Sequence, residues 1–199
     1  MTDFNFAARD YDFVSYVDCK NWIGGQWVDA QSGKTIDVDN PRHKKTMGQV
    51  VWSDRADVDA AVEAASAALK GWRTTPLKER VQVLFRMKQL MEEHIDELSW
   101  LLSHENGKTI AQARGSVLKG IECVEFGTSL PNLSQGENLD VSRGINCEVT
   151  HEPVGVCGGI VPFNFPFMVP MWTLPISLTA GNVINQFILE RLVYFGEDG

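Results

Sequence analysis

The middle of the chain carries apolar residues at helical spacing, whereas the segments before and after it alternate apolar and polar positions or run continuously apolar. After Ser53 and Asp54, either of which can cap a helix, apolar residues follow the spacing i, i+3, i+4 and i+7. This stripe predicts a helix that ends near Gly71, because glycine favours the left-handed conformation that closes many helices.

Two more helices are predicted downstream. The first begins at Pro76, where the missing backbone N–H costs nothing, and continues at helical period to the neighbourhood of Asn106. The second covers residues 110–126. Gly115 and Gly120 weaken the prediction that this helix is continuous, because each glycine costs about 1 kcal/mol relative to alanine.

Short strands are predicted on the amino-terminal side of the helices. Residues 22–28 read Trp-Ile-Gly-Gly-Gln-Trp-Val and predict a hairpin, because paired glycines supply the positive φ angles of a tight turn. Residues 36–38 and 47–52 predict two further strands.

After the helices, residues 130–136 predict a loop and residues 139–153 an extended segment. Within that segment Ile145, Cys147 and Val149 alternate with polar residues, which predicts a half-buried strand with one wet face.

The last part of the chain predicts a β-α-β unit. The continuous apolar run of residues 154–161 predicts a strand buried on both faces. A crossover helix over residues 168–178 and a strand over residues 183–189 complete the unit. The predicted fold class is therefore α/β with a parallel sheet.

Composition and charge place the chain among soluble globular proteins and argue against an overall basic surface, although net charge says nothing about local patches. It has 199 residues, of which 22% are charged, and a formal net charge of −8 with acidic and basic residues interleaved. That balance argues against a nucleic-acid surface or an anionic membrane surface. The N-terminus resembles neither a secretory signal nor a transit peptide, and no apolar run reaches membrane-spanning length. We therefore expect a cytoplasmic protein with no nucleic-acid or membrane partner.

The cysteines predict neither a metal site nor disulfides. The four cysteines and four histidines lack metal-binding spacing, and scattered cysteines agree with a reducing compartment. Cys157 lies inside the predicted buried strand and is interpreted as a small apolar residue, whereas Cys123 is interpreted as structural on a helix face. The sequence contains no GxGxxG, P-loop or HExxH motif.

One polar side chain, Asn164, follows directly after the predicted buried strand, within Val-Pro-Phe-Asn-Phe-Pro at residues 161–166. Ligands of parallel α/β sheets bind at the carboxyl ends of the strands, where a carboxamide N–H can donate to an oxyanion. One such donor is worth about 2.7–4 kcal/mol in the transition state. The alternative is that Asn164 only caps the following helix or forms an Asx-turn.

Several separated segments resemble the aldehyde dehydrogenase family. They are NWIGGQWVDAQSGKTIDVDNP, similar to its opening hairpin, HENGKTIAQARGSVLKGIECVEF, similar to a helical segment, and EPVGVCGGIVPFNFPFMVPMWTLPISLTAGN, similar to the start of its cofactor domain. The PFNFP core followed by MVPMW resembles the CoA-acylating methylmalonate-semialdehyde branch of the family. The resemblance covers residues 21–182 in the family's order.

The resemblance implies a fold and its division. We expect an aldehyde-dehydrogenase-like α/β fold in which residues 1–134 form an N-terminal hairpin and the helical part of the cofactor domain. Residues 135–153 match a β-arm through which family members form homo-oligomers. Residues 154–189 match the first β-α-β unit of a Rossmann-type NAD-binding sheet, and residues 190–199 form a divergent tail.

The resemblance also implies a reaction. In the family a cysteine thiolate attacks an aldehyde, the residue matching Asn164 helps to stabilise the oxyanion, hydride passes to NAD, and the resulting thioester is released by water or, in this branch, by coenzyme A. Val161, Pro162 and Phe163 match the stretch that lines the nicotinamide-ribose side of NAD. The implied partners are a small aldehyde such as methylmalonate semialdehyde, NAD and coenzyme A.

Three departures limit what the resemblance implies. The family's catalytic cysteine and general-base glutamate lie beyond the matching region, so the chain is expected to be a truncated form that is inactive alone. Phe187 stands near the place of a lysine that touches the adenosine ribose. Lys119 stands in place of an arginine associated with the substrate's carboxylate, and is either a substrate-binding residue or a solvated helix lysine.

Two non-catalytic alternatives therefore stay open. In one, the chain is a fragment whose arm pairs with a full-length subunit or with another copy of itself, because an unpaired strand edge is a template for pairing. In the other, it is a translated remnant without function, whose uncovered apolar sheet face favours aggregation.

Overall fold

The computed structural model describes residues 19–42 and 44–188. The strands are β1 (Asn21–Ile23), β2 (Gln26–Val28), β3 (Thr35–Asn40), β4 (Lys45–Val51), β5 (Glu137–Ser142), β6 (Ile145–Val149), β7 (Val156–Val161) and β8 (Val183–Ile188). The helices are α1 (Arg55–Trp72), α2 (Leu77–Glu93), α3 (Ile95–Asn106), α4 (Ile110–Thr128), α5 (Leu130–Leu133) and α6 (Pro170–Thr179). The predicted divergent tail, residues 190–199, lies outside the described residues.

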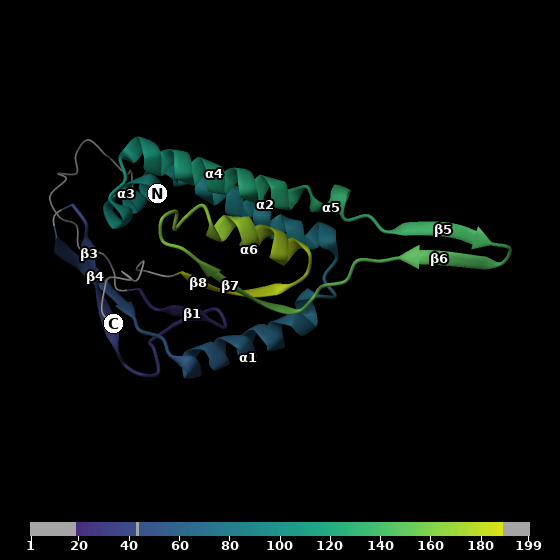
Figure 1. Ribbon diagram of the computed structural model, residues 1–199, viewed down its shortest axis with the longest axis horizontal. Coiled ribbons are helices and arrows are strands. Elements are labelled where there is room, and N and C mark those ends of the chain that lie inside the picture. Colours follow the sequence, from purple (N-terminus) through teal and green to yellow (C-terminus); the bar gives the residue numbers. More distant parts are fainter. Residues whose placement is uncertain (1–18, 43, 189–199) are drawn as a thin grey trace, which may run out of the picture.

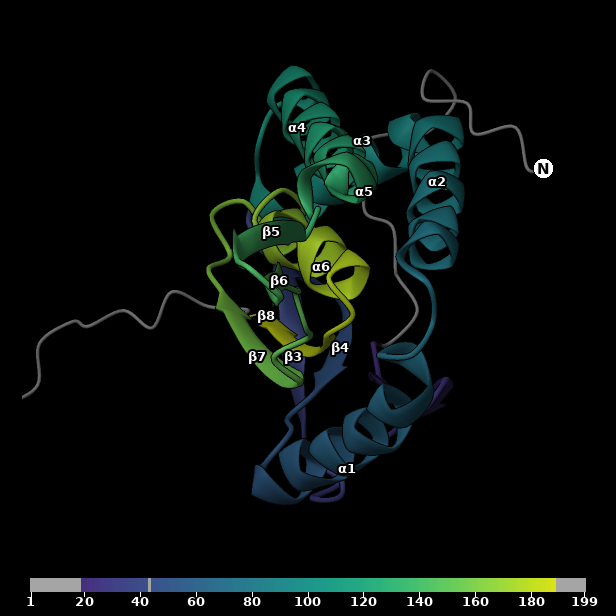
Figure 2. The same ribbon diagram turned by 90° about the vertical axis from the view of Figure 1, so that its right-hand side faces the viewer.

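The elements stack in layers around the parallel pair β7–β8 (Figures 1 and 2). Helix α6 packs on one side of the pair and α1 contacts it from the other, while α2, α3 and α4 lie beyond α6. The hairpin of β5 and β6 projects away from these layers along the long axis of the molecule (Figure 1). This arrangement confirms the predicted α/β fold class.

The predicted hairpin at residues 22–28 and the predicted parallel pair of the β-α-β unit are confirmed. Strands β1 and β2 form an antiparallel hairpin whose turn residues Gly24 and Gly25 have φ angles of 61° and 80°. Strands β3 and β4 pair antiparallel, and β7 pairs with β8 in parallel, with Val156 opposite Val183. Parallel pairing puts the carboxyl ends of β7 and β8 at the same edge.

Helix α1 begins at the predicted cap. The Asp54 side chain accepts from the Ala56 N–H, and Asp57 accepts from the backbone N–H groups of Asp54 and Gln31, each at 2.9 Å. The helix passes the predicted end by one residue and finishes at Trp72. The indole N–H of Trp72 donates to the carbonyl of Leu178 at 3.0 Å, which ties α1 to the end of α6.

The prediction of one helix from Pro76 to Asn106 is wrong, because the chain turns at His94 between α2 and α3. The φ and ψ angles of His94 are −107° and 17°, outside the helical region. Backbone hydrogen bonds continue across the turn, from His94 to Leu90 and from Leu98 to His94. The turn lets α2 and α3 each pack on α4, which one straight helix of that length cannot do.

Helix α4 is continuous through both glycines. Gly115 faces open space, but Gly120 is buried, and a Cβ atom there would lie 2.8 Å from Cε1 of Phe167. Glycine at position 120 therefore lets the segment before α6 approach α4 closely. The core between these helices contains Leu84, Met91, Leu102, Ala113, Val117, Ile121, Val124 and Met171.

The burial predicted for two strands is wrong. Every residue of β5 and β6 is exposed, because no described element lies against the apolar face of the hairpin. Strand β7 is not buried on both faces, since Ile160 is 72% exposed. Leu69 of α1 lies against Gly155 at the amino end of β7, but no described element covers Ile160 nearer the other end.

Two smaller points concern helices. The predicted loop over residues 130–136 contains the short helix α5. None of the helices in the described ranges combines the length and the apolar character needed to cross a membrane.

Candidate functional site

The candidate site is the turn that follows β7 and precedes α6. Val161, the last residue of β7, is buried, whereas Pro162 and Asn164 are exposed and Phe163 is half-buried. Apart from Lys119, the predicted site residues thus lie together at the carboxyl end of the parallel pair, the edge at which α/β sheets bind ligands.

The Asn164 side chain neither caps α6 nor forms an Asx-turn, the two purely structural roles that its place in the sequence allows. In the described part of the chain its carboxamide has no hydrogen-bond partner, so it forms no Asx-turn. The residue at the N-cap of α6 is Val169, and no side chain caps that helix. The amide is therefore exposed and available to an external acceptor.

A second turn, between α3 and α4, holds the backbone on both sides of Asn164. The Asn106 amide Nδ2 donates to the carbonyl oxygen of Phe163 at 2.8 Å, and Lys108 Nζ donates to the carbonyl oxygen of Asn164 at 2.6 Å. The Lys108 ammonium also lies over the ring of Phe165, 3.6 Å from its centroid, where the ring quadrupole attracts a cation.

The local sequence explains why the α3–α4 turn has a fixed shape. Gly107 ends α3 in the left-handed conformation with φ 76°, and its N–H donates to the carbonyl of Ser103 at 3.0 Å. Thr109 caps α4, and its side chain and that of Gln112 bond each other's backbone N–H groups in a capping box. Lys108 is therefore fixed between two capped helix ends.

The ammonium of Lys108 is partly withdrawn from water. Burial lowers the pKa of Lys108, because the charged form loses hydration. The carbonyl oxygen of Asn164 and the face of Phe165 replace part of that hydration.

Lys119, the predicted substrate-binding residue, is exposed on α4. Its Nζ lies 2.7 Å from Oε2 of Glu122, one turn further along the same helix. The ammonium thus pairs with Glu122 rather than with a residue of the Asn164 turn, although the adjacent Gly120 packs against Phe167 of the β7–α6 connection.

No cysteine belongs to the turn that holds Asn164. Burial, and then the charge of Glu122, raise the pKa of the Cys123 thiol, which lowers its thiolate fraction. Cys157 is half-buried in β7, with Sγ 3.9 Å from the carbonyl oxygen of Gly155. Cys19 and Cys147 are exposed on β-segments away from this turn in the chain.

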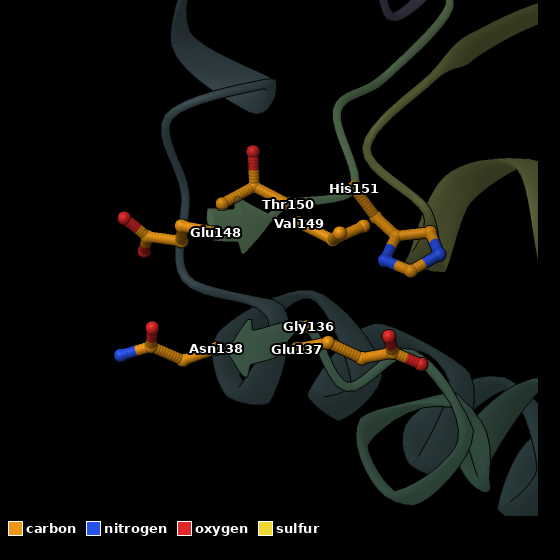
Figure 3. Close-up of a pocket in the computed structure, with 7 residues that line it drawn as sticks. All are labelled: Gly136, Glu137, Asn138, Glu148, Val149, Thr150 and His151. Carbon is orange, nitrogen blue, oxygen red and sulfur yellow. The ribbon is translucent and has the colours of Figure 1, made fainter. Parts of the chain in front are cut away.

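Two cavities lie outside the turn. One of about 410 Å³ lies at the base of the β5–β6 hairpin, where Figure 3 shows Asn138 and Glu148 pointing to one side and Glu137 and His151 to the other. These side chains diverge, so they form no convergent site. The second, about 830 Å³, lies beside the α3–α4 turn and is lined by Asn106 and Lys108 but not by Asn164.

The described side chains give no indication of a metal site. Within residues 19–42 and 44–188, no group of three or more His, Cys, Asp and Glu side chains is arranged to hold a metal ion.

Sequence reasoning missed Asn106 and Lys108 as site residues. The segment HENGKT carried part of the family resemblance, and an Asn-Gly-Lys-Thr run between two helical patterns is itself a signal for a turn. The turn sequence does not reveal which carbonyl groups the side chains of Asn106 and Lys108 will contact, because those carbonyls are 57 and 56 positions away in the sequence.

Comparison with known proteins gives the same family throughout. Residues 27–185 match the model of the aldehyde dehydrogenase family. A malonate-semialdehyde dehydrogenase of Geobacillus kaustophilus is 48% identical over 172 residues, which are 86% of this chain and 35% of that protein. The chain thus spans about a third of the length of the curated relatives that it matches.

Solved structures agree. The methylmalonate-semialdehyde dehydrogenase of Oceanimonas doudoroffii superposes with a TM-score of 0.82 at 38% identity, over 85% of this chain and 35% of that one. A structure from Sinorhizobium meliloti, assigned as a methylmalonate-semialdehyde dehydrogenase and complexed with NAD, gives a TM-score of 0.85 at 35% identity, over 89% of this chain and 36% of that one. This chain belongs to the aldehyde dehydrogenase family.

Proposed function

We propose that this chain supplies the oxyanion-binding and nicotinamide-side part of an NAD-dependent semialdehyde dehydrogenase that works through a cysteine thioester. The observation that carries the proposal is Asn164, an exposed and unpartnered carboxamide at the carboxyl end of β7 whose flanking backbone carbonyls are held by Asn106 and Lys108.

Asn164 acts by donating its side-chain N–H to the oxygen of the aldehyde as a thiolate attacks the carbonyl carbon. The oxygen gains negative charge in that step, so a donor already in place stabilises the transition state more than the ground state. An amide with an internal partner would have to break that bond first, and Asn164 has none in the described residues.

Val161, Pro162 and Phe163 line the nicotinamide-ribose side of NAD in this proposal. Pro162 is exposed at the carboxyl end of β7, the edge at which α/β sheets bind ligands, which fits a bound dinucleotide. NAD supplies the hydride acceptor when it is bound. The NAD complex of the Sinorhizobium meliloti structure supports this assignment.

The proposed substrate is a small semialdehyde such as methylmalonate or malonate semialdehyde, with coenzyme A as the acyl acceptor. The names of the relatives support this substrate class. Lys119 is proposed to attract the substrate's carboxylate as a point charge, without the bidentate geometry of an arginine. It must leave Glu122 to do so, which makes it the weakest of the proposed contacts.

The 199-residue chain alone is proposed to form no NADH with any aldehyde, because none of its cysteines stands in the sequence context of the family's nucleophile. A chimera tests the function directly. Residues 27–185 would replace the matching segment of the Geobacillus kaustophilus malonate-semialdehyde dehydrogenase. The chimera should oxidise malonate semialdehyde, and Asn164→Ala should lower its kcat/KM by about 10²–10³-fold, the usual effect of one oxyanion donor.

Two results would contradict this proposal. The first is a well-folded chimera without activity, and the second is an Asn164→Ala chimera as active as its parent. Lys119→Met serves as a matched control, because it should raise KM for the semialdehyde while leaving the oxyanion donor in place.

The hairpin of β5 and β6 supports a second candidate function, a non-catalytic role in pairing. Leu139 pairs with Cys147, and both lie on the same face of the hairpin as Ile145 and Val149. Asn146 and Glu148 lie on the other face. All of these residues are exposed. We propose that the apolar face packs against a family subunit or a second copy of this chain.

The pairing role has a simple test. Ile145→Thr should leave the unfolding free energy of the chain within about 0.5 kcal/mol, as for other exposed substitutions, but should weaken self-association or co-purification with the full-length relative. A wild-type chain that stays monomeric and recovers no family subunit would eliminate this role.

A further inference from the structure

We propose that Asn106 and Lys108 are positioning residues that fix the backbone of Asn164 and so the direction in which its side chain leaves the chain. The inference deepens the proposed function, because it rests on Asn164 as the oxyanion donor. Neither residue needs to touch substrate or cofactor to act in this way.

Two peptide groups flank the Cα atom of Asn164. The carbonyl of Phe163 belongs to the peptide group before that atom, and the carbonyl of Asn164 belongs to the peptide group after it. Each peptide group is planar, so the backbone at Asn164 has only the two torsions φ and ψ.

Asn106 holds the first of these carbonyl oxygens and Lys108 holds the second. With both planes held, φ and ψ of Asn164 are fixed, and the direction of its Cα–Cβ bond follows. Only the side-chain torsions remain free. The two hydrogen bonds therefore orient a side chain that forms no hydrogen bond of its own among the described residues.

Other contacts hold the ends of the turn but not its centre. Pro162 and Pro166 restrict φ at their own positions, and the Val169 N–H donates to the carbonyl of Phe165 at 3.1 Å. None of these acts on the two planes beside Asn164. Water could satisfy both carbonyls as hydrogen-bond acceptors, but water is not attached to a helix and would not fix their direction.

The anchors themselves are rigid. Asn106 is the last residue of α3, and Lys108 lies between the left-handed Gly107 and the capping residue Thr109. The Lys108 ammonium also contacts the Phe165 ring, so that one side chain holds both the second plane and the residue beyond it. The α3–α4 turn thus transmits the position of two helices to the candidate catalytic amide.

The test is backbone ¹⁵N relaxation on the intact 199-residue chain. The N–H of Asn164 reports the first plane and the N–H of Phe165 reports the second. In the wild type both should have order parameters near 0.85, the value of rigid backbone. Asn106→Ala should lower the value mainly at Asn164, and Lys108→Met mainly at Phe165, to below about 0.6.

Two controls separate positioning from general stability. Lys108→Arg keeps a cationic donor and should restore order at Phe165, whereas Lys119→Met removes an exposed α4 lysine and should change neither amide. Thermal unfolding of each variant is measured alongside. The fall in the order parameter should be larger than a lower melting temperature alone would explain.

The measurement uses neither aldehyde nor NAD, so its outcome is independent of the activity of the Asn164→Ala chimera. Wild-type order parameters below about 0.6 at both amides would overturn the positioning role without any variant. So would rigid amides in both Asn106→Ala and Lys108→Met. If Lys108→Met fails to fold, the decision rests on Asn106→Ala and on the wild-type values.

Discussion

The β5–β6 hairpin and the turn between β7 and α6 are both exposed, but they are held in different ways. The hairpin is held by the pairing of its own two strands, and every residue in them is exposed. The turn is held by Asn106 and Lys108, which lie 57 and 56 positions away from the residues that they bond. Exposure alone therefore does not distinguish a free segment from a fixed one.

The difference has a functional meaning. A surface that pairs with another chain can remain uncovered until the partner arrives, because association itself buries it. An oxyanion donor must already point in the right direction when charge develops, since reorganisation during the reaction lowers its value. The fixed turn fits the second requirement and the free hairpin fits the first.

The largest predicted effect compares two glycines with positive φ angles, Gly181 after α6 and Gly144 at the tip of the hairpin. Alanine at either position adopts a left-handed conformation at about 1–2 kcal/mol. A Cβ atom at Gly181 would also collide with the Arg80 guanidinium and lie 2.7 Å from Cγ of Pro153, whereas Gly144 has open space.

Overpacking adds about 1–3 kcal/mol, so Gly181→Ala should lower the free energy of unfolding by about 2–5 kcal/mol and Gly144→Ala by only about 1–2 kcal/mol. Urea denaturation followed by circular dichroism measures both. Equal losses in the two variants would show that Arg80 and Pro153 move aside from a Cβ atom at position 181 without cost.

The next effect concerns the support that α4 gives to the β7–α6 connection. Gly115→Ala should raise the free energy of unfolding by about 0.5–1 kcal/mol, because alanine is the better helix former and the site is open. Gly120→Ala gains the same helix propensity, but its Cβ atom would collide with the Phe167 ring. We therefore expect the free energy of unfolding to fall by about 1 kcal/mol. Equal gains in the free energy of unfolding of the two variants would show that the segment between β7 and α6 moves freely away from α4.

The smallest effect compares Lys108 with Lys88 at high pH. Burial lowers the pKa of Lys108, so between its folded pKa and its ordinary value of 10.5 the unfolded chain binds more protons. The contribution of Lys108 to stability should therefore rise with pH in that interval. Hydrogen bonds that the Lys88 ammonium donates to the carboxylates of Glu92 and Glu125 raise the pKa of Lys88, so its contribution is complete below 10.5 and is lost as pH rises above it.

Urea denaturation between pH 8 and pH 11 checks the two signs, with each lysine's contribution taken as wild type minus the Lys→Met variant. The two difference curves should slope in opposite directions. Both slopes should be shallow, because solvent screens partly exposed charges. Parallel curves would show that Lys108 is as well solvated in the folded chain as in the unfolded one.

The parts of the fold that could be predicted from sequence are those with local causes. Gly24 and Gly25 predict their hairpin from turn chemistry, and Asp54 predicts the start of α1 from capping. The β-α-β unit follows from the apolar run, the helical segment after it and the strand pattern of residues 183–189. Asn164 could be named as a candidate because an amide directly after such a strand has no use in a core, and its role as an oxyanion donor stays a prediction.

The parts that could not be predicted depend on what lies beside each element. Nothing local at His94 marks the change of direction, which serves packing of α2 and α3 on α4. The alternation of Ile145 with polar residues predicts a face correctly but not whether that face is covered. Lys108 looks like any turn lysine until the carbonyl of Asn164 is placed against it.

The most direct measurement of the central claim is kcat/KM for the chimera carrying Asn164→Ala, Lys108→Met or both. If Lys108 acts only by orienting Asn164, the double variant should be no slower than Asn164→Ala alone, which should itself lose about 10²–10³-fold. Losses that multiply in the double variant would contradict a shared role, and an Asn164→Ala chimera with unchanged kcat/KM would contradict the account of the site.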